Sequence, residues 1–202
     1  MKKEEFLFIC GVEGSGHELF RTVLSEYLSG KSNIVNMVQR GAFSSASFPY
    51  SQPRDAYRRP NISHMVKNTP NDVSLKILAL YRDPRFAVYS GFRRKVTNDI
   101  LLQCKIVDIN LKYIREELDK LDPKMYRIIR FEKFIENPHQ YTEMLISFIS
   151  VSKESLERGY EKIKTPNFSL HDQKEVLNKF FKDKDINDYG FHDLYLRTRK
   201  VE

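Results

Sequence analysis

The chain has 202 residues, of which 41% are hydrophobic, and a formal net charge of +7. This length fits one domain with a substantial buried core, so we predict a single domain over residues 1–202. No run of about 18 apolar residues is present to cross a membrane, and the first strand pattern leaves no room for the hydrophobic region of a signal peptide. We therefore expect no membrane span, a cytoplasmic location and, from the positive charge, an anionic ligand.

The first predicted elements are a strand and a helix joined by a glycine-rich turn. Residues 6–10 (FLFIC) form a continuous apolar run, which is typical of a central parallel strand covered on both faces. Gly11, Gly14 and Gly16 follow, and apolar residues then recur at helical spacing over residues 19–24. Glycines allow backbone N–H groups to converge on an anion, and a helix N-terminus adds partial positive charge. This order predicts a phosphate-binding loop.

The loop differs from the Walker A pattern of ATP and GTP enzymes. Gly11 and Gly16 have the required spacing, but His17 and Glu18 stand where that pattern has Lys and Ser or Thr. The lysine contacts the β and γ phosphates and the hydroxyl binds magnesium, so their joint absence argues against a nucleoside triphosphatase. A P-loop kinase with a degenerate Walker motif is kept as an alternative.

Two further segments follow the first helix. Residues 33–38 predict a second short strand. Residues 41–61 are rich in Ser, Pro, Arg and Tyr and have no steady period, which predicts a long loop, flexible or acting as a lid.

A second anion-binding segment is predicted at residues 75–90. The run LKILAL at residues 75–80 indicates a buried strand that delivers Arg82 to its carboxyl end, where ligands bind in open α/β sheets. Pro84 suits the first turn of the next helix, and Ser90 lies about two turns into it. Arg82 and Ser90 are therefore predicted to bind one further phosphate.

The remaining pattern is helical. Apolar residues recur every three or four positions over residues 100–121, which predicts a long helix packed on the sheet, and residues 141–149 and 174–181 predict shorter helices. Cys10 and Cys104 have no neighbouring Cys or His cluster, so both are expected to be buried thiols and no metal site is predicted. We predict an α/β fold of three layers, with a mostly parallel sheet flanked by helices.

Three segments together resemble the sulfotransferases that use 3′-phosphoadenosine-5′-phosphosulfate (PAPS). Gly11, Ser15 and Gly16 resemble the family's 5′-phosphosulfate loop, and Arg82 with Ser90 matches the spacing of its 3′-phosphate motif. Residues 126–138 (YRIIRFEKFIENP) resemble its later strand and turn. The resemblance covers roughly residues 6–148 and implies a P-loop NTPase-like sulfotransferase architecture without a metal.

The resemblance also implies the site residues. Sulfuryl transfer would use PAPS as donor and release 3′-phosphoadenosine-5′-phosphate (3′,5′-ADP). The implied donor-binding residues are Gly11, Glu13, Gly14, Ser15, Gly16, His17, Glu18, Arg82 and Ser90.

The sequence departs from the family pattern where the chemistry occurs. Gly14 occupies the usual position of a Lys or Arg, His17 replaces a Thr, and Phe131 replaces a Tyr. Negative charge develops on the bridging oxygen during transfer, so we expect His17 or Arg21 to supply the missing cation or donor.

The general base and the acceptor are less constrained. The family's use of a base near the acceptor favours His64 for removing the proton from a hydroxyl or amine, and Glu13 and Glu18 are carboxylate alternatives. The expected acceptor is a small molecule or saccharide rather than nucleic acid, and no oligomeric state is predicted. A catalytically silent nucleotide- or RNA-binding protein is the alternative from another class.

Overall fold

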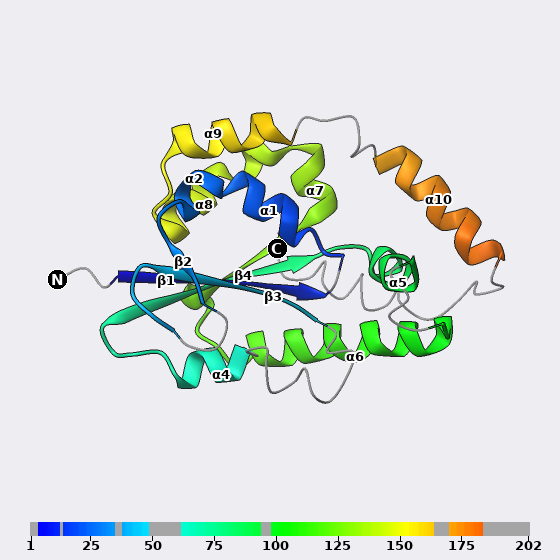
Figure 1. The fold of residues 1–202 in the computed structure, drawn as a ribbon, viewed down its shortest axis with the longest axis horizontal. Helices are drawn as coiled ribbons and strands as arrows, with labels where there is room; N and C mark the ends of the chain where they lie inside the picture. The colour runs from blue at the N-terminus through cyan, green and yellow to red at the C-terminus, as the bar shows by residue number, and fades with distance from the viewer. Residues whose placement is uncertain are drawn as a thin grey trace.

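A computed structural model describes residues 4–12, 14–34, 38–48, 62–93, 98–163 and 170–183. Within these residues a five-stranded sheet has the order β2-β3-β1-β4-β5, and every neighbouring pair is parallel. The sheet lies between two layers of helices (Figure 1). The predicted three-layer α/β fold is therefore confirmed. The strands are β1 (Glu4–Val12), β2 (Ser32–Asn33), β3 (Ala42–Phe48), β4 (Val73–Tyr81) and β5 (Tyr126–Arg130).

One helical layer packs against the face of the sheet formed by Leu7, Ile9, Leu78, Leu80 and Ile129. Figure 1 shows these helices above the sheet. They and the short 3₁₀ segment among them are α1 (His17–Val23), α2 (Ser25–Leu28), α7 (Phe131–Glu136), η2 (Pro138–Tyr141), α8 (Thr142–Ile149) and α9 (Lys153–Lys162).

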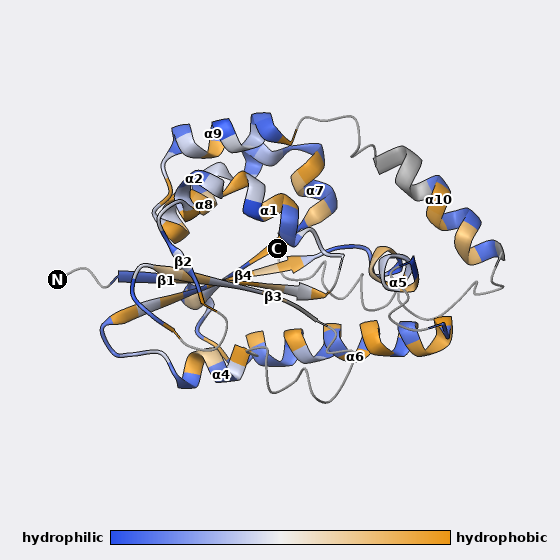
Figure 2. Ribbon diagram, in the orientation of Figure 1, coloured by the Kyte–Doolittle hydropathy of each residue, from blue (hydrophilic) through white to orange (hydrophobic). Residues whose placement is uncertain are grey.

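The opposite face carries the alternate residues of the same strands, including Phe6, Phe8, Cys10, Ile77 and Ala79. Successive strand side chains point to opposite faces, so a continuous apolar run such as FLFIC serves both layers. The apolar stripes of the covering helices are visible in Figure 2. The elements on this side are α4 (Ile62–Lys67), α5 (Pro84–Arg93), α6 (Ile100–Leu118) and η1 (Pro123–Met125), and α10 (Leu170–Asp183) packs against α5 beyond the carboxyl edge of the sheet.

Two predictions for the region after the first helix are corrected. The strand predicted at residues 33–38 is found only as β2, which spans Ser32–Asn33. Residues 35–37 lie outside the described part. The predicted loop at 41–61 begins with β3, while residues 49–61 lie outside the described part. Small Ala and Ser side chains in β3 give little hydrophobic period, and pairing with β1 and β2 determines its conformation.

The expected cysteine environments are confirmed, since Cys10 and Cys104 are buried free thiols. Burial raises the pKa of each to about 12, which keeps both protonated at neutral pH. Within the described ranges, no helix combines the length and the apolar character needed to cross a lipid bilayer.

Candidate functional site

The glycine loop lies at the carboxyl edge of the sheet, between the end of β1 and the start of α1 (Figure 1). β1 is the central strand, with β3 on one side and β4 on the other. The chain first builds β2 and β3 on one side and then crosses to build β4 and β5 on the other. Open α/β sheets bind ligands where the strand order reverses in this way, so the loop occupies the expected ligand position.

Two glycines give the loop its shape. Gly14 has a φ of 86° and Gly16 a φ of 99°, both in the left-handed region that side chains disfavour. A Cβ on Gly16 would also overlap the ring of Phe131, the first residue of α7. The loop therefore lies directly against the segment that follows β5.

Ser15 gives the loop a buried hydroxyl. Its side chain is fully buried, and its Oγ has no hydrogen-bond partner among the described residues. The backbone N–H of Ser15 donates to the carbonyl of Val12 at 3.0 Å, which closes the turn. Leaving a buried hydroxyl unpaired is unfavourable, so its chemistry fits a hydrogen bond to a phosphate or sulfuryl oxygen.

Arg82 and Ser90 reach the same loop from β4 and α5. Arg82 Nη1 donates to the carbonyl oxygen of Gly14 at 2.7 Å. A Cβ on Gly14 would lie 3.3 Å from Cβ of Ser90, so α5 packs directly on the loop. The two segments that the sequence predicted as anion-binding therefore lie together at one edge of the sheet.

The guanidinium of Arg82 lies between two aromatic rings. Its Cζ is 4.0 Å from the ring centroid of Phe86 and 4.1 Å from that of Phe131. Burial lowers the pKa of Arg82 to about 10, while the charges of Glu132 and Asp83 oppose this shift. Arg82 is therefore positively charged at neutral pH.

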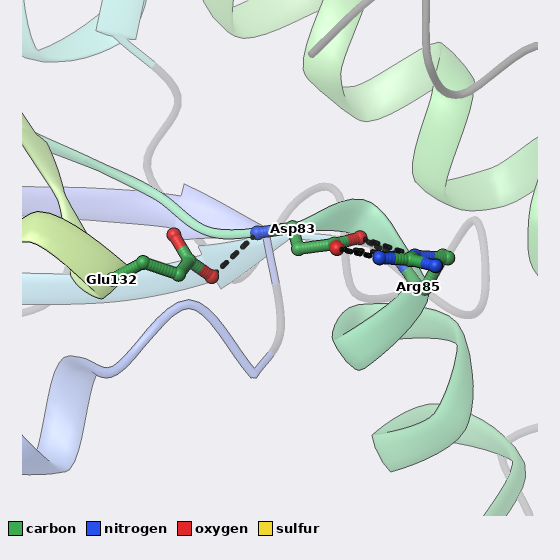
Figure 3. Close-up of polar contacts among 3 residues, drawn as sticks. All are labelled: Asp83, Arg85 and Glu132. Carbon is green, nitrogen blue, oxygen red and sulfur yellow. Dashed lines mark hydrogen bonds and ion pairs between the residues drawn. The ribbon is translucent and has the colours of Figure 1, made fainter. Parts of the chain in front are cut away.

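Glu132 connects the turn after β4 to α7. Its Oε1 accepts a hydrogen bond from the backbone N–H of Asp83 at 2.9 Å (Figure 3). The Asp83 carboxylate in turn accepts bonds from Arg85 Nε at 3.0 Å and Arg85 Nη2 at 2.6 Å. Burial raises the pKa of Glu132 above its ordinary value. The resemblance had pointed to this segment, since residues 126–138 match the family's later strand and turn and Phe131 stands where the family has a Tyr, but it did not name Phe131 or Glu132 as site residues.

His17 is partly buried and bonded to the neighbouring strand. Its Nε2–H donates to the carbonyl of Ala46 in β3 at 3.0 Å. Burial lowers the pKa of His17 to about 4, so the ring is neutral at pH 7. A neutral ring brings no positive charge to the loop, and its Nε2–H joins α1 to β3, so a role for His17 as a cation or donor in transfer stays a prediction.

The other loop candidates face solvent, lie buried in β1 or fall outside the described part. Arg21 and Glu18 form an exposed ion pair on α1, with 3.2 Å between Nη1 and Oε2. Gly11 is buried within the last part of β1. Glu13 lies outside the described residues.

His64 is not brought to the loop. It is an exposed residue of α4, and five residues separate the end of α4 from the start of β4. Figure 1 shows α4 beside the amino end of the sheet, whereas the loop lies at the carboxyl end. The structure therefore gives no geometric support to the prediction that His64 is the general base.

Solved structures of sulfotransferases share this fold. The sulfotransferase domain of the Synechococcus PCC 7002 olefin synthase matches with a TM-score of 0.58 at 14% identity, over 83% of each chain. The sulfotransferase domain from the curacin biosynthetic pathway matches with a TM-score of 0.55 at 14% identity, over 79% of each chain. The chain has the sulfotransferase fold.

A third solved structure is mouse sulfotransferase SULT7A1 complexed with PAP. It matches with a TM-score of 0.52 at 11% identity, over 99% of this chain and 90% of the mouse chain. No family model and no curated protein sequence matches the chain.

Proposed function

We propose that the chain binds PAPS at the glycine loop and transfers its sulfuryl group to a hydroxyl or amine acceptor. One observation carries this proposal: the buried, unpartnered hydroxyl of Ser15 lies in a loop on which Arg82 and Ser90 converge, within a sulfotransferase fold. The complex of SULT7A1 with PAP, the nucleotide product of such a transfer, supports the choice of ligand.

The residues that would bind the donor lie in the glycine loop and on α5. Ser15 and the loop backbone from Gly11 to His17 would hold the 5′-phosphosulfate, while Ser90 on α5 would hold the 3′-phosphate, with the positive charge of Arg82 beside it. PAPS supplies the transferable sulfuryl group when bound. The protein's part would be to orient this group for transfer.

A catalytically silent nucleotide-binding protein is the second candidate. Three observations favour it. Gly14 stands where the sulfotransferase loop usually has a Lys or Arg, the ring of His17 is neutral, and Arg21 forms an ion pair that faces solvent. Release of 3′,5′-ADP from PAPS, measured with small-molecule and saccharide acceptors, separates an enzyme from a silent binder.

The decisive first test is a thermal-shift titration with 3′,5′-ADP, 5′-AMP and ATP with magnesium. A ligand that binds only the folded protein raises the melting temperature, by roughly 5–10 °C at about 100 times its dissociation constant for a chain of this size. We expect the largest shift with 3′,5′-ADP. A larger shift with ATP and magnesium would favour a kinase, and no shift with any nucleotide would contradict the proposal.

Two serine variants sharpen this test. Ser15→Ala should lower the affinity for 3′,5′-ADP about tenfold while leaving the melting temperature of the ligand-free protein unchanged or higher, because it removes an unpaired buried hydroxyl. Ser44 in β3 is a matched control, since its Oγ is also buried without a partner among the described residues. Ser44→Ala should leave the affinity unchanged.

A further inference from the structure

The side chain of Arg82 joins three segments that are distant in the sequence. It donates to the Gly14 carbonyl in the loop, and it stacks on Phe86 of α5 and Phe131 of α7. The Phe131 ring also lies where a Cβ on Gly16 would lie. Arg82 and Phe131 together therefore contact both glycines that have left-handed backbone conformations in the loop.

The bond to Gly14 controls the orientation of one peptide group. In a trans peptide the carbonyl and the following N–H point in opposite directions. Arg82 holds the Gly14 carbonyl, and the N–H of the same peptide, which belongs to Ser15, donates to Val12. Both polar groups of this peptide are thus engaged, which fixes the backbone that carries the buried Ser15 hydroxyl.

The backbone of Arg82 is itself held in place. Glu132 accepts a hydrogen bond from the backbone N–H of Asp83 (Figure 3). This N–H belongs to the peptide group that joins Arg82 to Asp83. Asp83 is fixed in turn by its paired contacts with Arg85. The carboxylate of Glu132 also favours the charged form of Arg82, so it opposes the effect of burial on the guanidinium.

The geometry points to Arg82 as a positioning residue that fixes the conformation of the glycine loop, rather than as a ligand of the 3′-phosphate. This inference deepens the proposed function and rests on it for its nucleotide readout. It makes a distinctive prediction: loss of Arg82 weakens every ligand that uses the loop, whether or not that ligand carries a 3′-phosphate.

Isothermal titration calorimetry of Arg82→Gln with 3′,5′-ADP and 5′-AMP separates the two roles. A positioning role predicts that both affinities fall by the same factor, about tenfold or more, so that the preference for 3′,5′-ADP stays within about twofold of its original value. Ser90→Ala is the contrasting variant and should weaken 3′,5′-ADP selectively. Arg93→Gln, on the exposed end of α5, is the matched arginine control and should change neither affinity.

Hydrogen exchange of the ligand-free protein is the second readout. Arg82→Gln should raise amide exchange across residues 14–17 by about tenfold or more, while Arg93→Gln leaves it unchanged. Selective loss of 3′,5′-ADP binding, or unchanged exchange in the loop of Arg82→Gln, would overturn the inference. If Arg82→Gln does not fold, Arg82→Lys replaces it with the same criteria, because lysine keeps the charge but lacks the planar fork.

The two proposals can fail separately. If the unmodified protein binds neither nucleotide, the proposed function is contradicted, and the exchange measurement alone decides the role of Arg82. If it binds 3′,5′-ADP but Arg82→Gln loses only the 3′-phosphate preference, the proposed function stands and the positioning role is rejected.

Discussion

Gly16 is subject to two independent constraints. Its φ of 99° disfavours any side chain, and the Phe131 ring occupies the space that a Cβ would need. Gly41 provides a natural comparison, because its φ is 61° but nothing lies within 4 Å of its Cβ position. A comparison of Gly16 with Gly41 therefore separates the cost of backbone strain from the cost of steric overlap.

We predict that Gly41→Ala lowers the free energy of unfolding by about 1–2 kcal/mol, the cost of a left-handed conformation alone. Gly16→Ala should lower it by roughly 2–5 kcal/mol, because overlap with Phe131 adds to that cost. Urea unfolding of both variants measures the difference. Equal losses would show that the Phe131 ring moves aside freely.

At this scale the sequence predicted the loop and the segment of Arg82 and Ser90, but not the contact of Phe131 with the loop. Gly14, Ser15 and Gly16 are contiguous with a strand and a helix, so local pattern alone located them. Phe131 reaches the loop from more than a hundred residues away, and only the folded sheet brings it there. The same limit applies to His64, because proximity in sequence to the Arg82 strand did not indicate which end of the sheet it would occupy.

At the scale of elements, α1 depends on a close contact with α9. A Cβ on Gly159 in α9 would overlap the carbonyl of Val23, the last residue of α1. The two helices can approach this closely only because position 159 lacks a side chain. α9 thereby supports the helix that begins at the end of the glycine loop.

We predict that Gly159→Ala lowers the free energy of unfolding by about 1–3 kcal/mol, because the helices must separate. In a helix interior without such a contact, replacing Gly by Ala would raise the free energy of unfolding by about 1 kcal/mol. Lys153→Ala, at an exposed position of α9, should stay within about 0.5 kcal/mol of the original protein. Chemical denaturation of both variants makes the comparison, and a gain for Gly159→Ala would contradict the close contact.

Elements whose apolar residues recur at a regular spacing could be predicted from the sequence, whereas β3 could not. The long helix at residues 100–121 is found as α6, Ile100–Leu118, with its apolar stripe in the core. In β3 the residues Ala42, Ser44 and Ala46 are small, so their burial leaves no marked pattern in the sequence. Their conformation is set by pairing with β1, which is a long-range contact.

At the scale of the whole molecule, His17 couples stability to pH. Burial lowers its pKa to about 4 from an ordinary value of 6.5. Between these values the unfolded chain binds more protons than the folded protein. The contribution of His17 is therefore present above about pH 6.5 and is lost as the pH falls towards 4.

We predict that between pH 7 and pH 4.5 the original protein loses about 2 kcal/mol more unfolding free energy than His17→Gln. Glutamine can also donate to the Ala46 carbonyl but does not titrate, so the other ionisable groups cancel in the comparison. Urea unfolding at both pH values provides the measurement. Parallel losses in the two proteins would show that His17 titrates as it does in water.

The 68-residue separation between Gly14 and Arg82 has a consequence for protein synthesis. A ribosome releases the glycine-rich segment well before Arg82, and Arg82 well before Phe131 and Glu132. A nascent chain that ends before β5 carries every residue of the loop but lacks two of the side chains that hold it. The loop therefore reaches its folded conformation late, once β5 has docked beside β4.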